Sequence, residues 1–273
     1  MTNRAAVLGS PISHSLSPAL HRAAYRALGL DDWTYETVEL DQSGLAAWLA
    51  ALGPEWKGLS LTMPLKRTAL GLVDHVQPLA RMVGAANTVL FNPAGSVGAN
   101  TDVHGIVAAI GETVGAPARA RSASLLGGGA TAASALAALA ELGVRDPRVY
   151  VRSLARTAPL VAAAGRLRVE PRLRKLDLDR PPLDWAADLT VATLPPHAGD
   201  QLADCLDGRQ VAAGAVLLDV TYDPWPSRLA QAWDAAGGVV VSGKAMLLHQ
   251  AAAQFKMMTG YEAPLAAMRA AIA

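Results

Sequence analysis

The sequence predicts an α/β protein with two domains built on mostly parallel sheets, and three observations support this. Short apolar stretches with strand character alternate with helical patterns along most of the chain. A glycine turn, LGGGATAA, separates one such strand from one such helix near the middle. The length of 273 residues suits two modest domains.

In the first hundred residues, strands are expected at 5–8, 33–38, 58–61 and 87–91, and helices at 18–28 and 45–52. Ser17 and Gly29 are the expected caps of the 18–28 helix, and Pro64 is expected to open a further helix. A turn is expected at 92–95. Strands and helices that alternate in this way predict a mostly parallel sheet.

After a helix at 103–114, a second series of strands is expected at 124–126, in VYV, LTVAT and VLLDVTY, and at 238–241. The stretch 166–182 is rich in arginine and proline and is expected to be irregular. A last helix at about 244–259 is expected to fold back on the first domain. We therefore expect a discontinuous domain of residues 1–102 and 243–273, and a second domain of residues 103–242.

Bulk properties exclude several classes of partner. The net charge is only +1, with 52% hydrophobic and 17% charged residues, which gives no electrostatic case for nucleic acid or membrane binding. No apolar stretch reaches the roughly 20 residues that a bilayer requires. The single cysteine and the lack of a signal-peptide pattern favour the cytoplasm, and a monomer or homodimer is expected. The histidines lack compact ligand spacing, so no metal is expected.

The glycine turn predicts a dinucleotide site on a Rossmann-like domain. Gly127, Gly129 and Ala132 occupy the three small positions of G-x-G-x-x-G/A, between a strand and an alanine-rich helix. The next strand ends in Arg152, Arg156 follows four residues later, and no acid precedes Asp177. Arginine rather than an acid at this place favours NADP, because a 2′-phosphate needs a cation. The alternative is that these arginines are solvated loop charges.

Four polar segments interrupt the apolar first hundred residues: SHSLSP, SLTMPLK, GAANT and GANTDVHG. Together they supply many neutral hydrogen-bonding groups with one lysine and one aspartate, which suits a small polyhydroxylated substrate. Each is weak alone, since Ser17 can be a helix cap, Asn87 a turn former and Lys66 a surface charge.

Taken together, seven segments in order resemble those of shikimate dehydrogenases over essentially the whole chain. They are SPISHSLSP, SLTMPLK, GAANT, NTDVHG, GGGATA, DVTYDPWPS and SGKAMLLHQAAAQF. The resemblance implies NADP-dependent, reversible reduction of 3-dehydroshikimate to shikimate, a step in aromatic amino acid biosynthesis. It implies that Lys66 and Asp102 are the catalytic pair. It assigns substrate binding to Ser15, Ser17, Thr62, Asn87, Asp102, Tyr222 and Gln250. The expected cofactor-binding residues are Gly127, Gly128, Gly129, Ala130, Thr131, Arg152, Arg156, Thr193, Gly243 and Met246.

The chemistry of ketone reduction supports the pair independently. Hydride adds to carbon and a proton must reach the developing alkoxide, which a cationic lysine can both stabilise and protonate. Asp102 would orient that ammonium, and the pairing would make each charge less costly to bury.

The chain departs from the family pattern at four places. Ser60 stands where asparagine is usual and loses an amide donor, so a hydrogen bond near the site is expected to be absent or made by water. Ala130 replaces a glycine, which requires a backbone without positive φ there. The 152–157 segment lacks the usual N-R-T-x-x-R run, and Ala192 replaces a common asparagine.

Two rival functions remain open. Quinate dehydrogenase, with NAD, is a close alternative, although Ser17 favours shikimate because threonine is common there in quinate-using relatives. A non-catalytic ligand sensor on the same fold is the other, and the intact Lys66 and Asp102 argue against it.

Overall fold

The computed structural model describes residues 2–115, 119–177, 185–206 and 211–273. The chain divides into two compact units. The first comprises Met1–Asp102 with Leu247–Ala273, and the second comprises Val103–Met246. The long helix α9 (Gly243–Thr259) therefore begins in the second unit and continues into the first.

The first unit contains a six-stranded sheet in the order β2-β1-β3-β5-β6-β4. β1 runs parallel to both β2 and β3, and β4 parallel to β6, while β5 is antiparallel to β3 and to β6. The strands are β1 (Asn3–Gly9), β2 (Trp33–Glu39), β3 (Trp56–Leu61), β4 (His75–Val76), β5 (Thr88–Asn92) and β6 (Gly95–Ala99).

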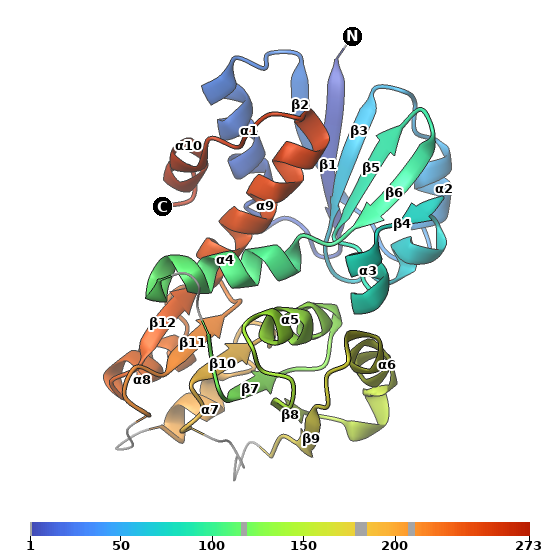
Figure 1. Cartoon of the computed structure of the whole chain (residues 1–273). Helices are drawn as coiled ribbons and strands as arrows, with labels where there is room; N and C mark the ends of the chain where they lie inside the picture. The colour runs from blue at the N-terminus through green and yellow to red at the C-terminus, as the bar shows by residue number, and fades with distance from the viewer. Residues whose placement is uncertain (1, 116–118, 178–184, 207–210) are drawn as a thin grey trace. The chain divides into compact units, whose positions relative to one another are not determined.

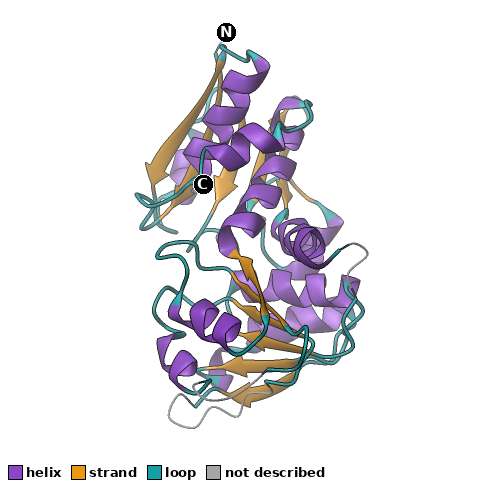
Figure 2. Cartoon of the chain, turned by 90° about the vertical axis from the view of Figure 1, so that its left-hand side faces the viewer, coloured by secondary structure: helices purple, strands orange, loops and turns teal. Residues whose placement is uncertain are grey.

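Helices cover both faces of this sheet, and the central strand β1 is buried on both (Figures 1 and 2). Ala5 and Val7 pack with α1 (Ser17–Leu28), α9 and α10 (Leu265–Ala270). Ala6 and Leu8 point to the other face, toward α2 (Leu45–Ala50) and the 3-10 helix η1 (Thr68–Gly71). A parallel strand buried on both sides has apolar residues in succession, as β1 does.

Two local predictions in the first unit are wrong. The cap position of α1 is Leu16, and Ser17 is already helical, whereas the predicted cap Gly29 does adopt the left-handed conformation with φ 65°. Pro64 opens a turn that leads to η1 and not an α-helix. The carbonyl of Lys66 accepts the N–H of Ala86 at 2.8 Å, so it is committed to a neighbouring segment. The short elements α3 (Pro78–Val83), β4, β6 and α10 were not expected.

The second unit contains an all-parallel sheet in the order β12-β11-β10-β7-β8-β9. Its strands are β7 (Ala123–Leu126), β8 (Arg148–Val151), β9 (Arg172–Lys175), β10 (Leu189–Ala192), β11 (Val216–Asp219) and β12 (Val239–Ser242). Its other helices are α4 (Asp102–Val114), α5 (Ala130–Glu141), η2 (Leu154–Arg156), α6 (Ala158–Leu167), α7 (Asp200–Asp204) and α8 (Arg228–Ala235). The strand order reverses between β7 and β10, which makes this pair the topological switch point.

The stretch 166–182, expected to be irregular, contains the end of α6 and the strand β9. β9 is an edge strand that pairs only with β8, and most of its side chains are exposed. An exposed edge strand needs no alternation of apolar residues, so the arginine-rich sequence hid it. Residues 178–182 lie outside the described part of the chain.

Candidate active site

The sheet of the first unit brings the predicted polar segments to one edge. β1, β3 and β6 end there, at Gly9, Leu61 and Ala99. β5 begins there, at Thr88, because it runs antiparallel to both β3 and β6. The segments that follow β1, β3 and β6, and the one that precedes β5, therefore meet.

Backbone hydrogen bonds fasten these segments to one another. The N–H of Ser10 donates to the carbonyl of Met63 at 2.9 Å, and that of Thr62 to Leu8 at 2.9 Å. The N–H of Leu61 donates to the carbonyl of Asn87 at 2.7 Å. Because each loop is bonded to a strand or to another loop, the side chains it carries are held in place.

Lys66 and Asp102 form the ion pair at this edge. Lys66 Nζ lies 2.6 Å from Asp102 Oδ2, and the two side chains are 13% and 4% exposed. Asp102 is the first residue of α4, where the positive end of the helix dipole favours a carboxylate. The Lys66 side chain is therefore mostly buried but not fully closed off from its surroundings.

The amide of Asn87 joins the ion pair to its surroundings. Its Nδ2 donates to Asp102 Oδ1 at 2.8 Å, to Thr101 Oγ1 at 2.9 Å and to Gln250 Oε1 at 3.1 Å. Its Oδ1 accepts the backbone N–H of Thr101 at 2.8 Å and the hydroxyl of Thr88 at 3.0 Å. The structure thus brings Lys66, Asn87, Asp102 and Gln250 into one connected cluster.

Ser15, Ser17 and Thr62 flank the same edge of the sheet. The backbone N–H of Ser17 donates to Ser15 Oγ at 3.4 Å, so the Ser15 hydroxyl lies beside the first residue of α1. Thr62 directly follows β3, and a Cβ on Gly9 would lie 2.3 Å from its Cγ2, which requires a glycine at position 9. Tyr222, the remaining predicted substrate contact, belongs to the second unit and follows β11.

Three buried polar residues near the site have hydrogen-bonding roles that the sequence did not predict: Tyr35, Ser60 and Gln254. The hydroxyl of Tyr35 donates to Ser60 Oγ at 2.6 Å, and Ser60 donates to Gln254 Oε1 at 2.7 Å. Ser60 therefore has two side-chain partners, and the expected loss of the asparagine's amide hydrogen bond stays a prediction. Burial raises the pKa of Tyr35 well above its usual range, against its hydrogen bonds to Ser60 and Ser17. The spacing of Gln250 and Gln254, four apart on one helix, was the available signal.

In the second unit, the glycine turn lies at the switch point. Gly127 follows β7 with φ 118°, and a Cβ there would lie 2.3 Å from Thr193 Oγ1. Thr193 follows β10 and donates its hydroxyl to the carbonyl of Leu126 at 2.9 Å. The predicted residues Gly127 and Thr193 are thus in contact at the carboxyl ends of the two strands, where open α/β sheets bind ligands.

The start of α5 has the features of a phosphate-binding helix end. Gly129 is its cap residue, no described side chain caps it, and a Cβ on Gly129 would meet no described atom within 4 Å. Ala130 and Thr131 open the helix, and Ala130 has no positive φ, so alanine is tolerated in place of glycine. A Cβ on Gly128 would lie 3.2 Å from Val151 Cγ1, so this glycine packs closely against β8. Free N–H groups at a helix start attract phosphate.

Arg152 and Arg156 follow β8, the strand that neighbours β7 in the sheet. Both are exposed, and neither forms an ion pair with any residue that the structure describes. Gly243 and Met246 open α9, where a Cβ on Gly243 would lie 2.3 Å from the carbonyl oxygen of Val220. Close packing of backbone on backbone explains that glycine.

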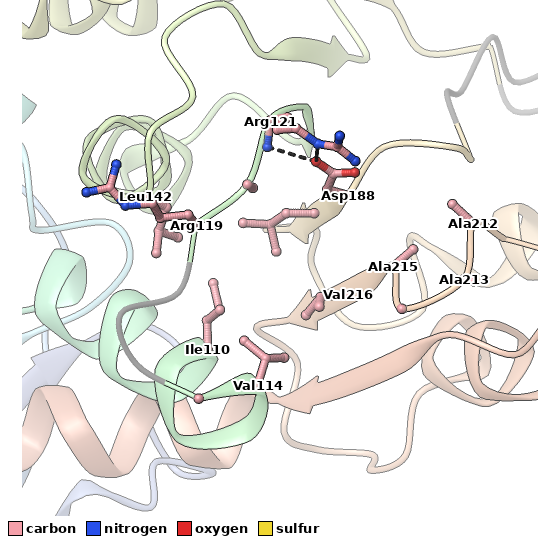
Figure 3. A pocket seen from close by; sticks show the side chains of 14 residues that line it. Ile110, Val114, Arg119, Arg121, Leu142, Asp188, Ala212, Ala213, Ala215 and Val216 are labelled. Atoms are coloured by element: carbon pink, nitrogen blue, oxygen red, sulfur yellow. Dashed lines mark hydrogen bonds and ion pairs between the residues drawn. The ribbon is translucent and has the colours of Figure 1, made fainter.

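A separate pocket of about 420 Å³ lies in the second unit, at the amino ends of β7, β10 and β11 (Figure 3). Ile110 and Val216 line it, together with Arg121, whose N–H donates to Asp188 Oδ2 at 2.8 Å. It lies at the opposite ends of the strands from the glycine turn, so it is not the predicted cofactor site. Among the described residues, no cluster could hold a metal ion and no helix could span a membrane.

Two family models match the chain. The shikimate dehydrogenase substrate binding domain matches residues 7–89, and the shikimate 5′-dehydrogenase C-terminal domain matches residues 245–273. A shikimate dehydrogenase (NADP(+)) of Citrifermentans bemidjiense is 36% identical over 100% of this chain and 95% of its own length. One of Thermosynechococcus vestitus is 36% identical over 97% and 93%.

Solved structures agree with the sequence matches. The Mycobacterium tuberculosis shikimate dehydrogenase is 44% identical with a TM-score of 0.85, covering 99% of this chain and 98% of its own. The Thermus thermophilus enzyme in complex with NADP(H) and shikimate is 30% identical with a TM-score of 0.82, over 99% and 98%. A Corynebacterium glutamicum quinate dehydrogenase in complex with NAD is 27% identical with a TM-score of 0.82, over 99% and 98%. With these relatives matched from end to end, the chain belongs to the shikimate dehydrogenase family.

Proposed function

We propose that this chain reduces 3-dehydroshikimate reversibly to shikimate, with NADPH as the hydride donor and Lys66 with Asp102 as the proton-handling pair. The observation that carries the proposal is the 2.6 Å ion pair among neutral hydrogen-bonding groups at one edge of the first unit's sheet. Relatives over 30% identical along nearly the whole chain are NADP-dependent shikimate dehydrogenases, and this protein is an oxidoreductase of that kind.

Lys66 would act on the carbonyl oxygen. The bound nicotinamide supplies a hydride to the ring carbon, and the electron pair of the C=O bond moves to oxygen. The Lys66 ammonium then stabilises this developing alkoxide and gives it a proton, which produces the alcohol. Asp102, which accepts a hydrogen bond from Asn87 at 2.8 Å, would orient the Lys66 ammonium. It would also accept a hydrogen bond from a neighbouring ring hydroxyl. In the reverse direction, neutral Lys66 takes the proton back.

Neutral side chains would hold the rest of the substrate. Thr62, Asn87 and Gln250 would bind ring hydroxyls, because each supplies an amide or hydroxyl at the same sheet edge. Ser15 and Ser17 would bind the carboxylate through their hydroxyls, and Tyr222 would reach the same end of the ring. Apart from that of Tyr222, which lies within 103–242, these roles would assign substrate binding to residues 1–102 and 243–273.

Residues 103–242 would bind the cofactor. The pyrophosphate would lie at the start of α5, against the 127–131 turn, where Gly129 leaves open space. The exposed guanidinium groups of Arg152 and Arg156 would take the 2′-phosphate. Thr193 would belong to the same cofactor site. Gly243 and Met246, which follow this range in the chain, would lie near the nicotinamide. We further propose a cytoplasmic enzyme that acts as a monomer or homodimer, which size-exclusion chromatography would test.

The test is an activity matrix of shikimate and quinate, each with NADP and with NAD. We expect the highest kcat/KM for shikimate with NADP. A preference for quinate with NAD would instead support the activity of the Corynebacterium glutamicum relative. Absence of turnover with all four pairs would favour a ligand sensor.

The same assay tests the lysine. Lys66→Ala is expected to lower kcat by about 10²–10⁴-fold with little change in substrate affinity, because it removes the proton donor. Lys57→Ala, a change at a lysine on β3 of the same unit, is the matched control and should keep full activity. An unchanged kcat in Lys66→Ala would exclude this lysine from the mechanism.

A further inference from the structure

Gln254 is a fully buried amide one helical turn beyond Gln250 on α9, and its side chain is 1% exposed. It faces β3, because residues four apart on α9 contact residues two apart on β3. A Cβ on Gly58 would lie 2.6 Å from Met258 Cγ, and two residues along the strand Ser60 bonds to Gln254 at 2.7 Å. Side chains two apart on a strand and four apart on a helix share one face, so these contacts belong to one interface.

The donors and acceptors around Gln254 allow only one orientation of its amide. Nε2 donates to the carbonyl of Asn87 at 2.9 Å and to Thr88 Oγ1 at 2.9 Å. A carbonyl can only accept, so the nitrogen must face it, and Oε1 must then face Ser60. Ser60 therefore donates to Gln254 and accepts from the hydroxyl of Tyr35, which lies 2.6 Å away.

The same logic continues to the ion pair. The hydroxyl of Thr88 accepts from Gln254 and donates to Asn87 Oδ1 at 3.0 Å. Together with the backbone N–H of Thr101, which also donates to Asn87 Oδ1, this bond holds Oδ1 away from Asp102. Nδ2 is left to donate to the carboxylate at 2.8 Å. The hydrogen bonds run in one direction from Tyr35 to Asp102, and aligned bonds of this kind strengthen one another.

Tyr35, the first donor in this series of hydrogen bonds, is rigidly packed. The ring of Tyr35 stacks on that of His21 with centroids 4.1 Å apart and an interplanar angle of 13°. Tyr35 is 1% exposed and His21 is fully buried. The tyrosine hydroxyl therefore cannot turn away to water and stays within reach of Ser60 and Ser17. Because the Ser60 hydroxyl donates to Gln254, the Tyr35 hydroxyl is the donor in its contact with Ser60.

We propose that Gln254, held by Tyr35 and Ser60, is a positioning residue that fixes the amide of Asn87 toward Asp102 and the substrate. It supplies from α9 the amide that Ser60 does not supply from β3. The inference rests on the proposed function in one respect, since it assumes that Asn87 and Asp102 contact the reacting acid. Gln254 itself reaches Asn87 and Thr88 and acts on the reaction only through them.

The experiment compares Gln254→Met, Tyr35→Phe and Tyr25→Phe in the full-length protein. Methionine keeps the unbranched length of glutamine and removes its hydrogen bonds. The two tyrosine variants form a matched pair, because each loses one buried hydroxyl. Tyr25 Oη has no hydrogen-bond partner in the described part of the chain, whereas Tyr35 Oη begins the network. The readouts are kcat and KM for the acid and for the cofactor, the pH profile, and the side-chain ¹⁵N–¹H₂ signals of Asn87.

For Gln254→Met we expect kcat/KM for the acid to fall by about tenfold, the effect of losing buried hydrogen bonds. KM for NADP should not change, and the Asn87 signals should shift. Tyr35→Phe should act in the same direction by about threefold, a part of that loss, and Tyr25→Phe should match the wild type in every readout.

Wild-type kinetics and unchanged Asn87 signals in Gln254→Met, with only the melting temperature lowered, would show a purely structural role and overturn the proposal. If Gln254→Met does not fold, Tyr35→Phe decides by the same criteria. Lack of wild-type activity with all four acid and cofactor pairs would refute the proposed function alone, and the Asn87 signals would still decide whether Gln254 orients that amide.

Discussion

His21 should make the first unit sensitive to acid. Its imidazole is fully buried between the ring of Tyr35 and the core, and burial lowers its pKa from 6.5 to about 3, opposed by Gln254. The folded protein therefore keeps this histidine neutral, while the unfolded chain binds a proton below pH 6.5. The stabilisation is fully present above pH 6.5 and is lost as the pH falls from 6.5 toward 3.

The size of the effect follows from the difference between the two pKa values. Each pH unit in this window costs about 1.4 kcal/mol of the free energy of unfolding. At pH 5 the loss from this one group is about 2 kcal/mol relative to pH 7. The figure hardly depends on the folded pKa, since pH 5 lies well above a value of about 3.

The variant His21→Phe keeps a stacked ring and removes the proton-binding site. Its stability should fall by about 2 kcal/mol less than that of the wild type between pH 7 and pH 5. Native-state hydrogen exchange of the β1 and β2 amides in increasing urea would measure opening of the first unit alone. His75→Gln, which removes an exposed histidine of the same unit, should keep the wild-type pH dependence.

Equal pH dependence in His21→Phe and the wild type would refute the reasoning. Other groups do not confuse the comparison, because both proteins contain them. Asp219, for example, acts in the opposite direction: burial raises its pKa, so it favours the folded state as the pH falls. It also lies in the second unit.

The glycine turn and Arg152 give three further predictions. Gly127→Ala should lower the free energy of unfolding by about 1–3 kcal/mol in urea, because φ is 118° and the new Cβ would meet Thr193. Gly129→Ala should unfold at the wild-type urea concentration yet bind NADP more weakly by calorimetry, since its Cβ would enter only open space. Arg152→Ala should raise KM for NADP and leave that for NAD unchanged; equal changes would remove Arg152 from phosphate recognition.

The order of the longer strands and helices was predictable because most of them have their own pattern of apolar residues. The prediction was wrong where a partner elsewhere decided the local structure. The segment after Pro64 has the composition of a helix start, but the Lys66 carbonyl bonds to Ala86, twenty residues later. At β9, pairing with β8 alone makes a strand of an arginine-rich sequence. Neither bond leaves a mark in the local sequence.

In the candidate site, the residues expected to contact the substrate were easier to predict from the sequence than the buried residues that hold them. Lys66, Asn87 and Asp102 carry chemistry that a substrate would need, and they lie in short polar segments of an apolar region. Tyr35 and Ser60 lie within strands, where tyrosine and serine have ordinary structural uses. Their roles depend on the direction of hydrogen bonds to a residue almost two hundred positions away.

Gln254 shows why the roles of such buried residues need coordinates and yet leave a trace. A buried amide without partners would destabilise the fold, so its presence in a helix otherwise buried by apolar residues implies partners on the facing strand. Its spacing of four from Gln250 puts both amides on one side of α9. The sequence thus states that two amides face the sheet, but only the structure shows that one of them contacts Asn87 through the side chain and the other through the backbone. These contacts agree with the two proposed roles, substrate binding for Gln250 and positioning of Asn87 for Gln254.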